Sequence, residues 1–300
     1  MSSGLNRAVF RRPRLLLAAS VFYLALIFGV MLWRGIEIEP QWVVLALLLI
    51  AVAMGRGRQF VQDWSPFLLL FLAYEVMRGF AGQTGFQPHD VSGLERALFA
   101  GALPTVLLQH AFYDPRVIGF PDWAGMFFYF MHFPLPIVVG FLFWTNSREH
   151  YWRFISALLL MCFVAFVTYL AWPSTPPWLQ FPHDVVKIND HTIGKWGVSY
   201  LVSPLYTHLN PNKYAAFPSL HAAFPALAAI YAWSRYRLVA IALIAWTACV
   251  WLAIVYLGEH YFVDALAGLV YALAAVGAVE TVARRRRSGP KAPTPATPSS

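Results

Sequence analysis

Two histidines and one aspartate have the residue types and the spacing that nucleophilic or acid–base chemistry needs. His260 and Asp264 are four residues apart, a spacing that places two side chains on one face of a helix. The carboxylate can then hold one imidazole nitrogen of His260 and leave the other nitrogen to act as a nucleophile or base. His221 follows Pro218 and Ser219, which suit a helix start, so it is a candidate acid for protonating a leaving group.

Histidines in apolar segments also have a purely structural interpretation, in which the ring bonds a neighbouring carbonyl. For His132, which follows the aromatic run 127–130, we favour this interpretation but keep it as a candidate substrate-binding residue. For His221 and His260 we favour a catalytic role, because each is expected at the outer start of a helix and one has a carboxylate four residues on.

The composition identifies the class of protein. Hydrophobic residues make up 59% of the 300 residues and charged residues only 12%, whereas a soluble domain has about a quarter charged. With a mean hydropathy of +0.56, we expect an all-α, polytopic membrane helix bundle. The two cysteines, Cys162 and Cys249, both lie in apolar runs, which excludes a disulfide scaffold and a cysteine-bound zinc.

Apolar runs of about 20 residues, the length that crosses a bilayer, predict about eight transmembrane helices. They lie near 14–33, 41–55, 66–80, 123–144, 154–172, 217–234, 238–257 and 261–282. We divide the chain into an N-terminal cytoplasmic segment with two extra helices (1–65), a helical core (66–283) and a basic, Pro-rich, disordered cytoplasmic tail (284–300).

The arginines predict an orientation in the membrane. By the positive-inside rule, arginine-bearing connections and both arginine-rich termini are cytoplasmic. The connections 81–122, 173–216 and 258–260 then lie outside, so the candidate site faces away from the cytosol of what we expect to be a bacterial plasma membrane. We attribute the net charge of +8 to topology and anionic lipids rather than nucleic acid, because no basic face is interleaved with aromatics. The sequence gives no oligomeric state.

Two motifs resemble signatures of a known family. The run 218–221 (Pro-Ser-Leu-His) resembles the second signature of the type 2 phosphatidic acid phosphatase superfamily, and 260–264 (His-Tyr-Phe-Val-Asp) resembles the third. The resemblance implies a six-helix catalytic core in which His260 attacks phosphorus to form a phosphohistidine. Asp264 would orient that histidine, and His221 would protonate the departing oxygen. The resemblance implies no metal and no cofactor.

The chain departs from this family in its cationic residues. The usual first signature, a Lys followed seven residues later by Arg-Pro, is missing, and Ala253-Ile254 replaces the usual Ser-Arg pair. Phosphoryl transfer needs donors for charge on the equatorial oxygens. The candidates are Arg78, Lys213, Ser219 and the amino end of the following helix. Arg78 is equally suited to anchoring lipid headgroups, and Lys213 to a solvated turn.

Further runs resemble the inositol phosphorylceramide synthase branch, the aureobasidin-resistance type of inositol phosphotransferase, over roughly residues 66–275. These runs are 74–79, 104–109 and the Pro-rich turn 172–178. The branch implies a lipid phosphotransferase that moves an inositol-phosphate-like headgroup from a phospholipid donor to a lipid or polyol alcohol. Two alternatives stay open: a lipid phosphate phosphatase with water as acceptor, and a non-catalytic membrane scaffold.

Overall fold

The computed structural model describes residues 40–80, 85–132, 134–196 and 212–287. Within these ranges the chain forms twelve α-helices and no β-strand, which confirms the expected all-α class. The predicted span 14–33 lies outside the described residues.

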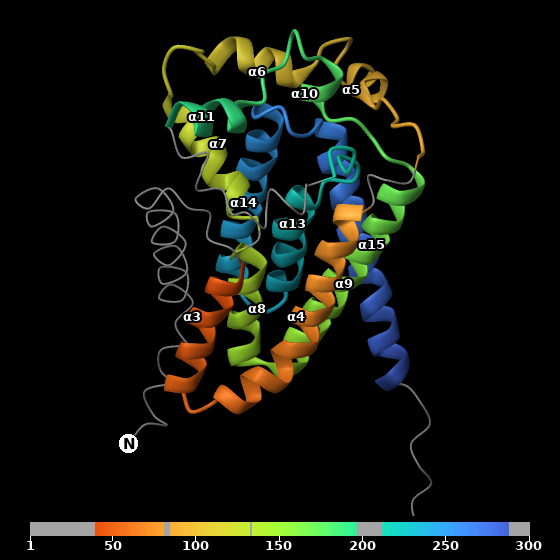
Figure 1. Ribbon diagram of the computed structural model, residues 1–300. Coiled ribbons are helices and arrows are strands. Elements are labelled where there is room, and N and C mark those ends of the chain that lie inside the picture. The colour runs from red at the N-terminus through yellow and green to blue at the C-terminus, as the bar shows by residue number, and fades with distance from the viewer. Residues whose placement is uncertain (1–39, 81–84, 133, 197–211, 288–300) are drawn as a thin grey trace, which may run out of the picture.

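The main bundle is built around one central helix. α13 packs against four other helices of the bundle and is buried along most of its length, which explains its small, apolar sequence. Figure 1 shows the helices of the bundle. They are α3 (Pro40–Ala53), α4 (Gly57–Phe80), α7 (Phe120–Phe130), α8 (Pro134–Asn146), α9 (Arg148–Ala171), α13 (Leu220–Trp233), α14 (Arg237–Tyr256) and α15 (Phe262–Arg287).

Only some of the predicted spans are helices that can cross a membrane unaided. In the described residues α9, α14 and α15 are long and apolar enough, and α7 with α8 makes a fourth if that bent pair is one span. The predicted span 123–144 comprises two helices rather than one, and α7 and α8 are bent by 49° relative to each other. Pro134 starts the second helix, a position where the missing N–H of proline costs no helical hydrogen bond.

Other predicted boundaries also shift. The runs 41–55 and 217–234 become α3 and α13, each of 14 residues, which is shorter than the roughly 20 residues a full span needs. The run 66–80 is the second part of α4, which already begins at Gly57. The predicted tail does not start at 284, because α15 continues to Arg287.

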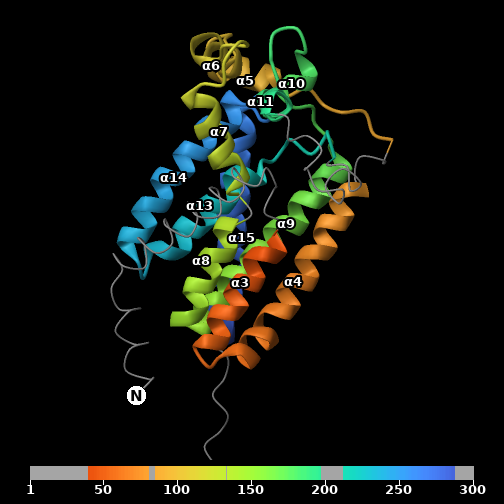
Figure 2. The same cartoon turned by 60° about the vertical axis from the view of Figure 1, so that its left-hand side comes forward.

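Four short helices form a cap over one end of the bundle, as Figures 1 and 2 show. They are α5 (Ser92–Leu98), α6 (Pro104–Phe112), α10 (Pro177–Gln180) and α11 (Ile188–Trp196). The sequence predicted only connecting segments here, because helices of four to nine residues are too short for a clear periodic pattern. Parallel β-bridges from Ser174 to His89 and to Ala215 tie the segments beneath the cap together.

The arginine-bearing connections meet at the other end of the bundle (Figure 1). Arg56 on the α3–α4 connection donates to the carbonyl of Thr145 at 3.2 Å. Arg153 in α9 pairs with Glu280 in α15 at 3.0 Å. The positive charges of these described segments therefore gather at one end of the bundle, opposite the cap.

Helix α15 approaches the start of α13 at a glycine. A Cβ atom added to Gly268 would lie 2.3 Å from the backbone oxygen of Ser219, and a backbone atom at a helix start cannot move aside cheaply. Only glycine permits this close approach. It brings the two predicted motifs, 218–221 and 260–264, together.

We expect Gly268→Ala to lower both stability and activity, the stability by about 1–3 kcal/mol or more, as in other overpacked cores. Gly277→Ala on the same helix is the matched control, because a Cβ there meets no atom within 4 Å and alanine favours a helix by about 1 kcal/mol. Thermal unfolding of the two variants in detergent tests this expectation. Equal midpoints would contradict the close approach at Gly268.

Candidate active site

His260 lies in the turn between α14 and α15, beneath the cap, and is only 5% exposed. Its Nδ1 atom is 3.0 Å from the backbone oxygen of Ala216. Because a carbonyl oxygen can only accept, Nδ1 carries the proton and Nε2 keeps a lone pair. This is the tautomer that a nucleophile attacking through Nε2 requires.

Asp264 lies one turn later, in the first turn of α15, and its side chain is completely buried. Its Oδ2 atom is 3.5 Å from His260 Nδ1 and accepts a hydrogen bond from the Tyr261 backbone N–H at 2.8 Å. Its Oδ1 atom has no hydrogen-bond partner among the described residues. When it is ionised, this carboxylate is close enough to stabilise a cationic His260, while Ala216 makes the shorter contact that orients the ring.

His221 lies in the first turn of α13, with its Nδ1 atom 3.2 Å from His260 Nε2. Since that Nε2 atom holds a lone pair, His221 Nδ1 is the donor in this contact. The Tyr129 ring stacks on His221 with centroids 4.5 Å apart and restricts its motion. The structure thus brings all three predicted catalytic side chains together, with a proton-bearing nitrogen of His221 beside the predicted nucleophile, His260.

His132 is a third histidine beside this pair. Its Nδ1 atom is 2.7 Å from the Tyr129 backbone oxygen, the carbonyl contact that the structural interpretation expects. Its ring centroid is also 4.0 Å from that of His221, so the bend after α7 places it within the candidate site. A substrate-binding role for His132 stays a prediction.

The remaining predicted phosphate ligands are less well placed. Ser219 is buried and caps α13, its Oγ accepting from the Ala222 N–H at 3.4 Å, while its own N–H donates to the Asp264 backbone oxygen. Lys213 is exposed in the turn before this segment. Arg78 is in the last turn of α4, and its side chain lies outside the described part of the chain. The phosphate-binding cation therefore stays a prediction.

The segment that presents the Ala216 carbonyl is fixed by neighbouring side chains. Ser174, in the Pro-rich turn after α9, accepts from the Phe217 N–H at 2.8 Å. The Tyr169 hydroxyl donates to the Pro218 oxygen at 2.7 Å, next to a cis peptide bond between Phe217 and Pro218. The turn 172–178 therefore helps to hold, through Ser174, the segment whose carbonyl orients His260.

Glu95 of α5 is a positioning residue that the sequence did not indicate. Its side chain is completely buried, and its two oxygens accept from the N–H groups of Phe262 and Val263, each at 3.0 Å. These N–H groups lie at the start of α15. The first N–H groups of a helix have no acceptor within that helix, and the positive end of the helix dipole favours a negative charge there. Burial raises the pKa of Glu95, although the two N–H donors act in the opposite direction.

Gln109 of α6 holds the other side of the same turn. Its side-chain nitrogen donates to the oxygens of Tyr256 at 2.9 Å and Val186 at 2.8 Å, and its oxygen accepts from the Val186 N–H. Gly258 completes the turn with a φ of +81°, a left-handed conformation that favours glycine. Cap helices therefore fix the backbone on both sides of His260, a long-range arrangement that no local sequence pattern could reveal.

We expect Glu95→Ala to lower turnover roughly tenfold or more, because misplacing a reacting group by about 1 Å can cost 10²-fold. Glu95→Gln keeps one acceptor oxygen and should fall between Glu95→Ala and the parent. Steady-state kinetics should show the loss in kcat rather than in KM, which separates positioning from substrate binding. A parental kcat for Glu95→Ala would show that the N–H groups at the start of α15 need no acceptor from Glu95 for turnover.

Comparison with known proteins agrees with this geometry. A family model described as the PAP2 superfamily matches residues 89–278, from the cap through both histidine motifs and into α15. The chain belongs to the PAP2 superfamily. The expected family is therefore confirmed, and the chain is an integral membrane enzyme of a family that acts on lipid phosphates.

A curated relative supports the expected branch within the PAP2 superfamily. Phosphoinositol dihydroceramide synthase of Bacteroides thetaiotaomicron is 32% identical over 227 residues, which are 69% of this chain and 72% of that protein. The resemblance to the inositol phosphorylceramide synthase branch is thereby confirmed. No solved structure matches the chain.

Proposed function

We propose that this enzyme is a lipid phosphotransferase that moves an inositol-phosphate-like headgroup from a phospholipid donor to a ceramide-type alcohol. The observation that carries the proposal is the His260–His221 pair, in which Nε2 of one ring faces the proton-bearing Nδ1 of the other at 3.2 Å. The name of the bacterial relative supports this headgroup and this acceptor.

In the first step, the His260 Nε2 lone pair attacks the phosphorus of the donor. His221 begins this step as an imidazolium, with a proton on each ring nitrogen. The bond from phosphorus to the diacylglycerol oxygen breaks, and His221 gives its Nδ1 proton to that oxygen and becomes neutral. The headgroup phosphate is left on His260 as a phosphohistidine. The Ala216 carbonyl holds the opposite ring nitrogen throughout, and the Asp264 carboxylate stabilises the positive charge on the ring.

The second step reverses these roles. His221, now neutral, takes the proton of the acceptor hydroxyl while that oxygen attacks phosphorus. The phosphorus–nitrogen bond breaks and His260 regains its lone pair. Burial of His260 and Asp264 beneath the cap supports a lipid alcohol over water as acceptor, because a closed site limits hydrolysis of the intermediate.

The phosphoryl oxygens also require positive charge, and we keep Arg78 as the first candidate, with Lys213 as the second. The orientation follows from the arginine-bearing end of the bundle, which lies opposite the cap (Figure 1). If that end is cytoplasmic, as the positive-inside rule requires, transfer takes place on the extracytoplasmic side of the membrane.

The proposal is tested with the full chain, phosphatidylinositol labelled with ³²P, and ceramide. We expect labelled product to depend on ceramide. His260→Ala should lower transfer by at least about 10³-fold and abolish the covalent label, whereas His221→Ala should lower it by roughly 10²–10⁴. His191→Ala is the matched control, since this cap histidine bonds the Tyr113 hydroxyl and plays no part in the mechanism.

Release of labelled inositol phosphate at the same rate with and without ceramide would instead identify a hydrolase with water as acceptor. Near-parental transfer by His260→Ala would contradict the assigned nucleophile.

A further inference from the structure

The two helices joined by the His260 turn separate below it. α13 packs extensively against both α14 and α15, whereas these two barely contact each other. Figures 1 and 2 both show α14 and α15 diverging from their shared turn. α13 therefore forms the floor between two walls that converge on the candidate active site.

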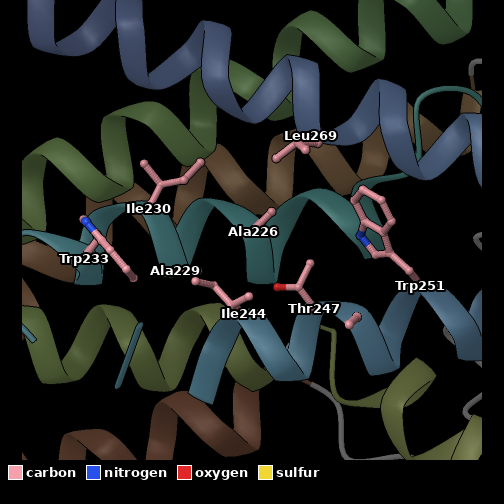
Figure 3. Close-up of a pocket in the computed structure, with 9 residues that line it drawn as sticks. Ala226, Ala229, Ile230, Trp233, Ile244, Thr247, Trp251 and Leu269 are labelled. Carbon is pink, nitrogen blue, oxygen red and sulfur yellow. The ribbon is translucent and has the colours of Figure 1, made fainter. Parts of the chain in front are cut away.

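A groove of about 480 Å³ lies between these helices (Figure 3). Its floor includes Ala226 and Ala229 of α13, and its walls include Ala248 of α14 and Leu269 of α15. Alanines at these positions leave the space open. The hydroxyl of Thr247, also in the lining, donates to the Leu243 backbone oxygen at 2.7 Å, so it is satisfied within its own helix. The groove therefore suits a purely apolar ligand.

Tryptophans mark the two ends of the groove, as Figure 3 shows for Trp233 and Trp251. The indole N–H of Trp251 donates to the backbone oxygen of Ala222 at 3.4 Å, and Ala222 directly follows His221. One end of the groove therefore adjoins the two histidines of the candidate site, and the other end lies at Trp233, the exposed last residue of α13.

The groove spans part of one leaflet of a bilayer. From Ala226 to Trp233, the first and last α13 residues that line the groove, α13 advances about 10 Å at 1.5 Å per residue. This distance is about a third of the roughly 30 Å hydrocarbon core. The volume also falls within the roughly 300–1,000 Å³ of sites that bind small molecules.

We propose that this groove holds one hydrocarbon chain of the lipid alcohol whose oxygen reacts at His221. The inference rests on the proposed function, because it is the transfer reaction that places a lipid alcohol there. In the first step this alcohol is the diacylglycerol that leaves, and in the second it is the acceptor that enters. Both must meet His221, so donor and acceptor chains use the same groove in turn.

The test uses the full chain in lipid nanodiscs and the variant Ala248→Trp, which fills the groove from an exposed position. Ala245→Trp is the matched control, because Ala245 is exposed on the same helix and does not line the groove. With a long-chain ceramide, Ala248→Trp should lower kcat/KM by roughly 10- to 100-fold, the scale of a misplaced substrate. A ceramide truncated to a few carbons on each chain should react at the parental rate.

A second measurement does not depend on turnover. Ceramide and phosphatidylinositol probes, each with a diazirine at a chain end, should photolabel peptides around Trp233 and Ile244 in the parent and in inactive His260→Ala. Both probes should lose this labelling in Ala248→Trp and keep it in Ala245→Trp. Labelling that survives Ala248→Trp would overturn the inference, and labelling by one probe alone would overturn the shared groove. Correct labelling without transfer would refute only the proposed function.

Discussion

The hydrogen bond between His260 Nδ1 and the Ala216 carbonyl is the constraint on which the site depends. It fixes which ring nitrogen carries the proton and points the other nitrogen at His221. An oxygen of the peptide backbone does not change its protonation state, so it can only accept from Nδ1. The Asp264 carboxylate adds charge beside the same nitrogen. Orientation and charge stabilisation, which often come from one carboxylate, are divided here between two groups.

This bond requires that two distant parts of the chain be held in register. The acceptor side is fixed by Ser174 and by the close approach of Gly268 to Ser219. The donor side is fixed by Glu95 and Gln109 from the cap. The cap is thus part of the catalytic framework as well as a cover, while the diverging helices below leave room for a lipid chain.

Patterns within a few consecutive residues predicted those features of the site that a few consecutive residues determine. The helix start at His221 and the all-α class are as expected. Asp264 lies beside His260, but the two do not share a helix face, because α15 begins only at Phe262 and His260 lies in the turn before it. The bend after α7 and the cap were missed, because proline effects and very short helices give little periodic signal. Glu95 could not be predicted at all, since its partners lie 167 and 168 residues away.

The proposed mechanism requires phosphorus to bond to Nε2 of His260. The decisive measurement is nitrogen–phosphorus coupling in the trapped intermediate, by NMR of the full chain labelled with ¹⁵N at the histidine ring nitrogens. We expect phosphorus coupled to Nε2 of one histidine, with Nδ1 still carrying its proton, and no such signal in His260→Ala. Phosphorus on Nδ1, or on another histidine, would contradict the role given to the Ala216 carbonyl.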